Sequence, residues 1–262
     1  MIFRTDQYRV LAFSGIDALA FLQSQLTNDV AALDVGGWQW QGYCSAKGRL
    51  LATFALARIG ADRFEAIVPV STVEALCKRL MMFRLRSKLT IEIPSDKVVL
   101  LATTGDPMTG AAPAADISAQ IALPDGRCLH VATAVAADAL PVADQSILNA
   151  WQLASITALI PEVTAATTEM FVPQMIGWDT VAPRGGVSFS KGCYPGQEIV
   201  ARAHYRGAVK RHLAIVKLTL TEPPTPGADV ELPDQRLGQV CNFALDPTRA
   251  GGYTALVVLG DN

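Results

Sequence analysis

The sequence predicts an α+β fold, and three observations support this class. The first is the order of patterns in the N-terminal part (strand, helix, three strands, helix, strand), which is ferredoxin-like. The second is a further group of strands and one helix, which predicts a second α/β subdomain packed against the first. The third is a change after about Gly207, where only strand patterns follow. A chain of 262 residues with 50% hydrophobic content can bury a substantial core.

The chain opens with a strand and a helix. Residues Tyr8 to Phe13 alternate in character, which predicts a strand. Ser14 is then expected to cap a helix. The apolar face of this helix consists of Leu19, Leu22 and Leu26.

Three strands follow, and we expect them to pair in an antiparallel arrangement. Their patterns begin at Trp38, Leu50 and Phe64, and glycine-containing turns at Lys47-Gly48 and Gly60 separate them.

A second helix and a strand complete the first subdomain. Ser71 and Glu74 have the spacing of a capping box, which predicts a helix start. Leu76, Leu80 and Phe83 are expected on its apolar face, before the strand K-L-T-I-E-I.

The second subdomain is predicted from strands beginning at Val98 and Cys128. A stretch rich in glycine, alanine and proline around Gly105 to Pro113 is typical of a surface loop between them. Asp144 is then expected to cap a helix. This helix turns three side chains toward the interior: Ile147, Leu148 and Trp151.

The C-terminal part is expected to be a small all-β unit. Strand patterns begin at Val209, Arg236 and Tyr253, and a proline-rich turn lies between the first two. We therefore expect residues 1–207 to form the two α/β subdomains and residues 208–262 to form a separate β domain.

Composition excludes several classes of function. The net charge is −2, from 22 basic and 24 acidic residues, so there is no overall positive field to hold a polyanion, and direct nucleic-acid binding is not expected. The N-terminal M-I-F-R-T-D-Q-Y-R-V contains charges where a secretory signal needs an apolar run. No stretch reaches the roughly 18 apolar residues of a membrane span. We expect a cytoplasmic protein that does not contact membranes.

The five cysteines are odd in number and widely spaced, which indicates neither a disulfide framework nor a C-x-x-C metal or redox pair. No metal site is therefore expected within the chain. Most lone cysteines are small hydrophobic side chains, and Cys77, Cys128 and Cys241 fit that interpretation. Cys44 is ambiguous. Cys193 differs because its surroundings are polar and rich in glycine.

Cys193 lies in the stretch V-S-F-S-K-G-C-Y-P-G-Q-E-I-V-A-R-A-H-Y-R-G, which spans residues 187–207. Pro195 suits the first turn of a helix, so Cys193 is expected just before a helix N-terminus. The positive end of the helix dipole and the neighbouring Lys191 both favour a thiolate. The pattern indicates a reactive or metal-binding sulfur.

Within this stretch, K-G-C-Y-P-G-Q-E resembles the K-G-C-Y-x-G-Q-E signature of the YgfZ family, whose members are relatives of the glycine-cleavage T-protein. The resemblance covers most of the chain. It extends to F-L-Q-S-Q-L-T-N-D-V from Phe21, Y-C-S-A-K-G-R from Tyr43, F-V-P-Q-M from Phe171 and G-G-V-S-F from Gly185.

The resemblance implies a T-protein-like fold of two interlocked folate-binding subdomains and a small C-terminal β-barrel around a central opening. The family is associated with assembly or repair of iron-sulfur clusters, including those of enzymes that thiolate tRNA, with tetrahydrofolate as the bound cofactor. The implied partners are therefore a folate and iron-sulfur client enzymes or assembly proteins, and any link to tRNA is indirect. Cys193, with Lys191 beside it, is the expected chemical group.

A folate needs an aromatic face for its pterin, a polar group for the amide-like edge and often a cation for its glutamate tail. Tyr8 and Trp151 align with tryptophans implicated in folate binding in related proteins, although Trp151 on an apolar helix face is more simply a core residue. Asp29 either accepts from the pterin or forms a helix-ending turn. Further candidates for the site are Lys47, Tyr194, Glu198 and Arg202.

Two other functions stay open. One is a true aminomethyltransferase, but T-proteins carry an acidic pair where this sequence has R-L-L-A-T-F, and Leu51 and Ala52 cannot position a folate amine. The other is a docking scaffold in which the folate site is vestigial.

Overall fold

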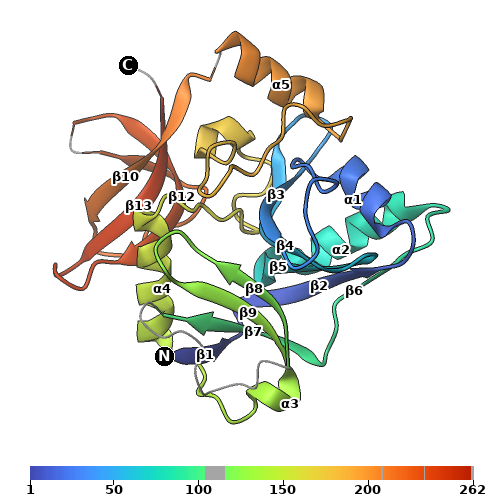
Figure 1. The fold of residues 1–262 in the computed structure, drawn as a ribbon. Coiled ribbons are helices and arrows are strands. Elements are labelled where there is room, and N and C mark those ends of the chain that lie inside the picture. The colour runs from blue at the N-terminus through green and yellow to red at the C-terminus, as the bar shows by residue number, and fades with distance from the viewer. Residues whose placement is uncertain (104–115, 208, 233, 261–262) are drawn as a thin grey trace.

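In the computed structural model, described for residues 1–103, 116–207, 209–232 and 234–260, the strands form three antiparallel sheets (Figure 1). The first sheet has five strands in the order β3-β4-β5-β2-β6. Its strands are β2 (Tyr8–Ser14), β3 (Trp38–Cys44), β4 (Leu50–Gly60), β5 (Arg63–Pro69) and β6 (Thr90–Glu92).

One face of the first sheet is covered by α1 (Ala18–Gln25) and α2 (Val70–Arg84). Leu22 of α1 and Leu80 of α2 are fully buried against sheet residues such as Phe64. Burying a side chain of this size contributes about 1.5–3 kcal/mol, so this layer is a stable unit.

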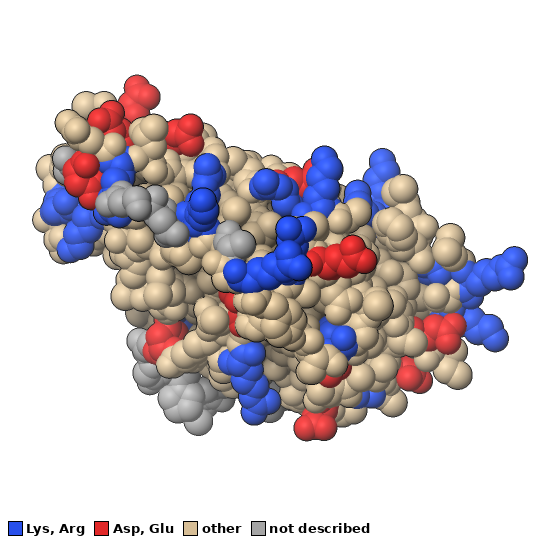
Figure 2. Space-filling model, turned by 90° about the horizontal axis from the view of Figure 1, so that it is seen from above, with Lys and Arg blue, Asp and Glu red and all other residues tan. Residues whose placement is uncertain are grey.

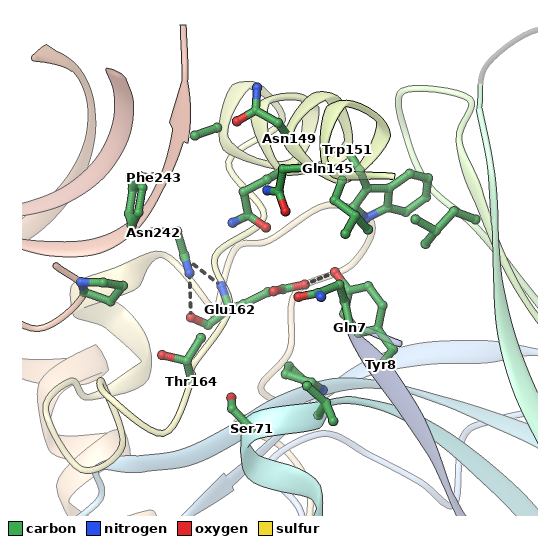
Figure 3. Close-up of a pocket in the computed structure, with 17 residues that line it drawn as sticks. Gln7, Tyr8, Ser71, Gln145, Asn149, Trp151, Glu162, Thr164, Asn242 and Phe243 are labelled. Carbon is green, nitrogen blue, oxygen red and sulfur yellow. Dashed lines mark hydrogen bonds between the residues drawn. The ribbon is translucent and has the colours of Figure 1, made fainter. Parts of the chain in front are cut away.

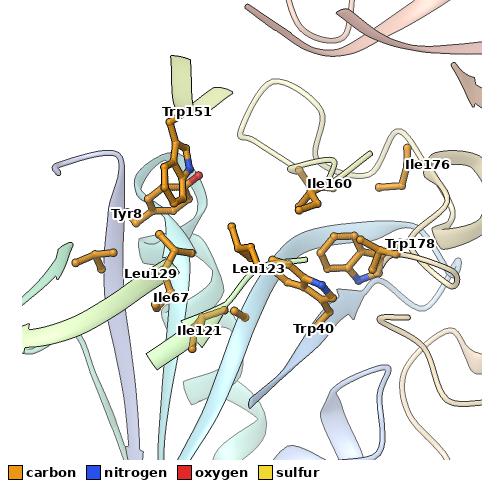
Figure 4. Packing of buried hydrophobic residues seen from close by; sticks show 14 of the residues in the cluster. Tyr8, Trp40, Ile67, Ile121, Leu123, Leu129, Trp151, Ile160, Ile176 and Trp178 are labelled. Atoms are coloured by element: carbon orange, nitrogen blue, oxygen red, sulfur yellow. The ribbon is translucent and has the colours of Figure 1, made fainter. Parts of the chain in front are cut away.

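The second sheet has the order β1-β7-β9-β8 and packs on the other face of the first (Figure 4). Its elements are β1 (Ile2–Thr5), β7 (Lys97–Ala102), β8 (Ile117–Ala122) and β9 (Cys128–Thr133), followed by α3 (Ala134–Ala137) and α4 (Gln145–Thr157). Leu129 and Ile121 of this sheet lie in one core with Ile67. A buried ion pair also links the two sheets, with Lys97 Nζ 3.3 Å from Glu65 Oε1.

The third sheet has the order β10-β13-β12-β11 and contains β10 (Arg211–Thr219), β11 (Asp229–Glu231), β12 (Leu237–Leu245) and β13 (Gly252–Gly260). Asn149 of α4 joins it to the rest of the molecule. Its Nδ2 donates to the Leu245 carbonyl at 3.0 Å, and its Oδ1 accepts from the Leu245 N–H at 2.7 Å. The connection from α4 contains the 3-10 helix η2 (Pro173–Ile176) and α5 (Gln197–Arg206).

The α+β class and the antiparallel pairing are confirmed, and so is the cap of α4, where Asp144 Oδ1 accepts from the N–H groups of Ser146 and Ile147 at 2.9 Å each. The short strands β1, β8 and β11 were not predicted from the sequence. The predicted loop at residues 105–113 lies outside the described residues.

The predicted caps of the first two helices are wrong. Ser14 is the last residue of β2 and pairs with Arg63, so α1 begins only at Ala18. Asp17 precedes that helix, and its carboxylate accepts from the Lys88 N–H at 2.7 Å.

Helix α2 starts at Val70 directly after β5, which places Ser71 inside its first turn rather than before it. Leu76 and Leu80 are buried as expected, but Phe83 is 44% exposed. Its ring lies 5.9 Å from the Arg79 guanidinium on the outer side of the helix.

The pairings among the described residues join the four strands of the third sheet in a row, and the C-terminal β-barrel stays a prediction. The boundary between residues 207 and 208 stays a prediction. None of the helices in the described ranges is long and apolar enough to cross a membrane.

Candidate functional site

A pocket with a volume of about 420 Å³ lies where elements of all three sheets meet (Figure 3). Its walls come from the start of β2, the start of α2, helix α4, the segment 162–164 and strand β12. The side chains that matter chemically are Tyr8, Trp151, Glu162 and Asn242.

Tyr8 and Glu162 form a hydrogen-bonded pair in this pocket, in which the Tyr8 hydroxyl donates to Glu162 Oε1. Burial raises the pKa of both groups above their ordinary values. For Glu162, the hydrogen bond from Tyr8 and the positive charge of Arg127 oppose this rise in pKa. The pair therefore presents a carboxylate in a buried setting, where its hydrogen bonds are stronger than in water.

The backbone of Glu162 is held by β12. The Glu162 N–H donates to Asn242 Oδ1 at 2.9 Å, and Asn242 Nδ2 donates to the Glu162 carbonyl at 3.0 Å. Asn242 is itself only 4% exposed. This reciprocal contact fixes the backbone of Glu162 to the third sheet, so the position from which its side chain extends is defined.

Trp151 is fixed from the side of the second sheet by Arg127. The guanidinium carbon of Arg127 lies 4.3 Å from the centre of the indole ring, and its Nη1 donates to the Trp151 carbonyl at 2.8 Å. The same nitrogen also reaches Ser155 Oγ, while Nε donates to Asp125. At 5% exposure Trp151 is a core residue, and it still lines the pocket.

A second region gathers the sequence segments that carry the family resemblance. Thr27 Oγ1 donates to the Gly186 carbonyl at 2.6 Å, and the Ser188 N–H donates to the Thr27 carbonyl at 3.0 Å. The turn at Gly48 packs on Gly196, where an added Cβ would lie 2.7 Å from the Gly48 backbone. Residues far apart in the chain thus build one compact region beside α5.

Lys191 is a structural member of this region. Its ammonium donates to three backbone carbonyls at the end of α1 and just beyond it, those of Gln23 and Leu26 at 2.6 Å each and of Asn28 at 3.0 Å. Burial lowers the pKa of Lys191 to about 8, and the negative charge of Asp29 opposes this. Its donors are committed to holding the segment 185–193 against α1.

Cys193 is exposed, in contrast to Cys44, Cys77 and Cys241, which are buried. It lies three residues before Gly196, the residue that precedes α5. Burial raises the pKa of Cys44 to about 12, so that thiol is protonated at neutral pH. The exposed thiol of Cys193 is accessible to another molecule. Figure 2 shows Lys and Arg side chains spread over the face of the molecule that is seen from above. Arg202 and Arg206 are exposed residues of α5.

The structure divides the predicted site residues between the two regions. Tyr8 and Trp151 line the pocket. Asp29 Oδ1 accepts from the N–H groups of Ala31 and Ala32, so it forms the turn after α1 that the sequence left open. The other candidates lie outside the pocket walls: Lys47 is exposed, Tyr194 is buried, and Glu198 and Arg202 are exposed on α5.

Sequence reasoning missed two residues of the pocket, Glu162 and Asn242. It also missed Arg127, which lies outside the pocket walls and binds the Trp151 carbonyl. The one signal for Glu162 was a single acidic residue in the otherwise apolar run L-I-P-E-V. Within the described part of the chain, no group of three His, Cys, Asp or Glu side chains lies close enough together to hold a metal ion.

A solved structure identifies the class of fold. The aminomethyltransferase T of the glycine cleavage system from Bartonella henselae matches with a TM-score of 0.63 and 15% identity, over 99% of this chain and 78% of that chain. This chain therefore has the fold of the T-protein class.

Sequence relatives give the family. Proteins named tRNA-modifying protein YgfZ from Sodalis glossinidius (strain morsitans) and Serratia proteamaculans (strain 568) are each 32% identical. Both matches cover 87% of this chain and 74% of the relative. The chain belongs to the YgfZ family. A scan against models of protein families finds none that matches.

Proposed function

We propose that this protein binds tetrahydrofolate in the pocket and serves the assembly or repair of iron-sulfur clusters in the cytoplasm, with Cys193 as its chemical group. The observation that carries the folate proposal is that a carboxylate, Glu162, lines one pocket together with two buried aromatic residues, Tyr8 and Trp151.

The donor and acceptor pattern of the pocket fits a pterin. The edge of a pterin presents an N–H and an amino group side by side, and a carboxylate accepts two parallel hydrogen bonds from such a pair. The Trp151 indole and Tyr8 phenol supply apolar faces for a flat ring. The neutral amides of Gln7 and Gln145 stand further along the wall. The volume of about 420 Å³ is in the range of small-molecule sites.

The role of Cys193 is supported by exposure and position. Its thiol is accessible, and the segment around it is held by the three hydrogen bonds of Lys191 and by the contact of Gly196 with Gly48. A rigid loop that presents one sulfur to the outside suits contact with an iron-sulfur client or an assembly protein. The relatives' name, tRNA-modifying protein, fits a role beside enzymes that modify tRNA.

Titration of the purified protein with tetrahydrofolate under anaerobic conditions tests the folate site. We expect Glu162→Gln to weaken binding by at least about tenfold, because a hydrogen bond to a charged group contributes about 1.5–3 kcal/mol. Trp151→Ala should also weaken it. Arg202→Ala on α5 is the matched control and should leave the affinity unchanged. Equal affinities of wild type and Glu162→Gln would refute the assignment of the pocket.

The thiol role is tested in cells that lack their own homologue, by measuring an iron-sulfur enzyme that thiolates tRNA. We expect Cys193→Ala to lose the support that the wild type gives, and Cys128→Ala, at a half-buried cysteine in β9, to retain it. Full activity of Cys193→Ala would leave the scaffold hypothesis as the better one.

Aminomethyl transfer is less well supported than the accessory role, although the fold is that of a transferase. Ala52 is fully buried in β4, and Leu51 packs against the core under α1 and α2. Among the described residues that line the pocket, Glu162 is the one carboxylate. A direct assay for one-carbon transfer to tetrahydrofolate should therefore show no turnover.

A further inference from the structure

Tyr8 stands where the family resemblance implies a tryptophan, and its role, as proposed below, rests on the proposed folate site. We propose that Tyr8 is a positioning residue whose hydroxyl, by donating to Glu162, keeps that carboxylate ionised and oriented toward a ligand with adjacent N–H donors. An aromatic ring at this position without the hydroxyl would then not orient the Glu162 carboxylate or keep it ionised.

The contacts of Glu162 show which groups can orient its side chain. Its backbone N–H and carbonyl are both bound by Asn242, which fixes the main chain but leaves the side-chain torsions free. Among the described residues, the Tyr8 hydroxyl is the hydrogen-bond donor to the carboxylate itself (Figure 3). The Tyr8 ring is buried in the core beside Trp151, and its backbone pairs with Pro69 of β5. A donor on a rigid strand therefore sets the direction of the carboxylate.

The charged and titratable groups around Glu162 come from three elements. Tyr8 belongs to β2, Arg127 to the turn before β9, and Cys241 to β12. Cys241 is fully buried, and burial together with the charge of Glu162 raises its pKa, so it stays a neutral thiol. Arg127 Nε binds Asp125 and its Nη1 binds Ser155 and the Trp151 carbonyl, whereas its buried Nη2 has no hydrogen-bond partner among the described residues. Arg127 acts on Glu162 through space, whereas Tyr8 acts by direct contact.

The protonation state of Glu162 matters because a protonated carboxyl group becomes a donor on one oxygen and no longer matches two N–H donors. Binding should therefore weaken as the pH falls through the pKa of Glu162. Burial raises this pKa and the Tyr8 hydrogen bond opposes the rise. Removing the hydroxyl raises the pKa further, so the loss of binding should begin at a higher pH.

The first test needs no ligand. Carbon-13 labelling of glutamate carboxyls, with Glu162→Gln to assign the signal, gives the pKa of Glu162 by NMR titration. We expect Tyr8→Phe to raise it by at least about one pH unit, the equivalent of one hydrogen bond to a charged group. Tyr205→Phe, at an exposed tyrosine on α5, should not change it. An unchanged pKa in Tyr8→Phe would overturn the proposal.

The second test uses tetrahydrofolate and a double-mutant cycle with Glu162→Gln. Tyr8→Phe should weaken binding by about tenfold at pH 7 in the wild-type background and by less than about twofold in the Glu162→Gln background. Equal losses in both backgrounds would mean that Tyr8 does not act through Glu162. If wild type fails to bind tetrahydrofolate, the proposed function fails, and the NMR titration still decides whether Tyr8 controls Glu162.

Discussion

At the scale of single residues, the contacts of Lys191 in the structure differ from those that the sequence indicates. Beside a cysteine in a glycine-rich segment, a lysine is naturally interpreted as a group that activates the thiol. Its ammonium is instead used by the carbonyls of Gln23, Leu26 and Asn28. A helix leaves its last carbonyls unpaired, and a buried ammonium is a good partner for them. No sequence pattern shows that these carbonyls, more than 160 residues away, will lie there.

Replacing Lys191 by methionine should therefore destabilise the protein. The change keeps much of the side-chain volume but leaves three carbonyls without a donor, and each buried unpaired polar group costs about 1–3 kcal/mol. We expect a loss of about 3 kcal/mol in the free energy of unfolding, measured by urea denaturation. Lys47→Met, at an exposed lysine in the neighbouring turn, is the control and should change it by about 0.5 kcal/mol or less. Equal stabilities of the two variants would contradict the structural role.

The pocket residues show a second limit of sequence reasoning. Trp151 was correctly placed on an inward face, and Tyr8 was placed in a strand. Glu162 was missed because it lies in an irregular segment, where no periodicity indicates which way a side chain points. Its importance depends on Asn242, which comes 80 residues later. Local patterns predict elements, whereas a site between elements depends on how they pack.

At the scale of elements, the two glycines around Cys193 have different tasks. Gly196 has a φ of +80° and lies against the turn Ser45 to Gly48, where an added Cβ would be 2.3 Å from the Ser45 carbonyl oxygen. Gly192 has open space around it. The segment thus combines one tight contact, which places the start of α5, with one position that tolerates a side chain.

Gly196→Ala and Gly192→Ala form a matched pair within one loop. A left-handed conformation costs a non-glycine residue about 1–2 kcal/mol, and a clash with backbone adds about 1–3 kcal/mol. We expect Gly196→Ala to lower the free energy of unfolding by about 3 kcal/mol and Gly192→Ala to change it by less than about 1 kcal/mol. Denaturation curves that do not separate the two variants would mean that the Gly48 contact is unimportant.

Strands and helices with strong periodicity were predicted well, whereas their ends were not. The cap of α4 was found because Asp144 precedes the helix directly and its side chain is free to bind the first N–H groups. Ser14 and Ser71 have equally suitable side chains, but strand pairing extends to Ser14, and α2 follows β5 without a gap. In both cases tertiary structure, rather than local preference, decides where the helix begins.

At the scale of the whole molecule, the pocket joins parts that are otherwise separate layers. Tyr8 comes from the first sheet, Trp151 from the helix after the second sheet and Asn242 from the third sheet. Cys193 and α5 do not contribute to its walls. The two candidate regions are therefore separate in space, and the pocket lies where the three sheets connect.

Tetrahydrofolate should accordingly stabilise the molecule as a whole and protect specific elements. At a hundredfold excess over its dissociation constant, a ligand that binds only the folded state adds about 2.7 kcal/mol to the free energy of unfolding. Hydrogen exchange should slow together at the start of β2, in α4 and around Asn242 in β12, because all three line the pocket. Exchange in α5 should stay the same. At the same ligand concentration, the roughly tenfold weaker binding of Glu162→Gln should reduce the added stability to about 1.4 kcal/mol and lessen the protection. Protection confined to α5 would instead place the ligand in the region of Cys193.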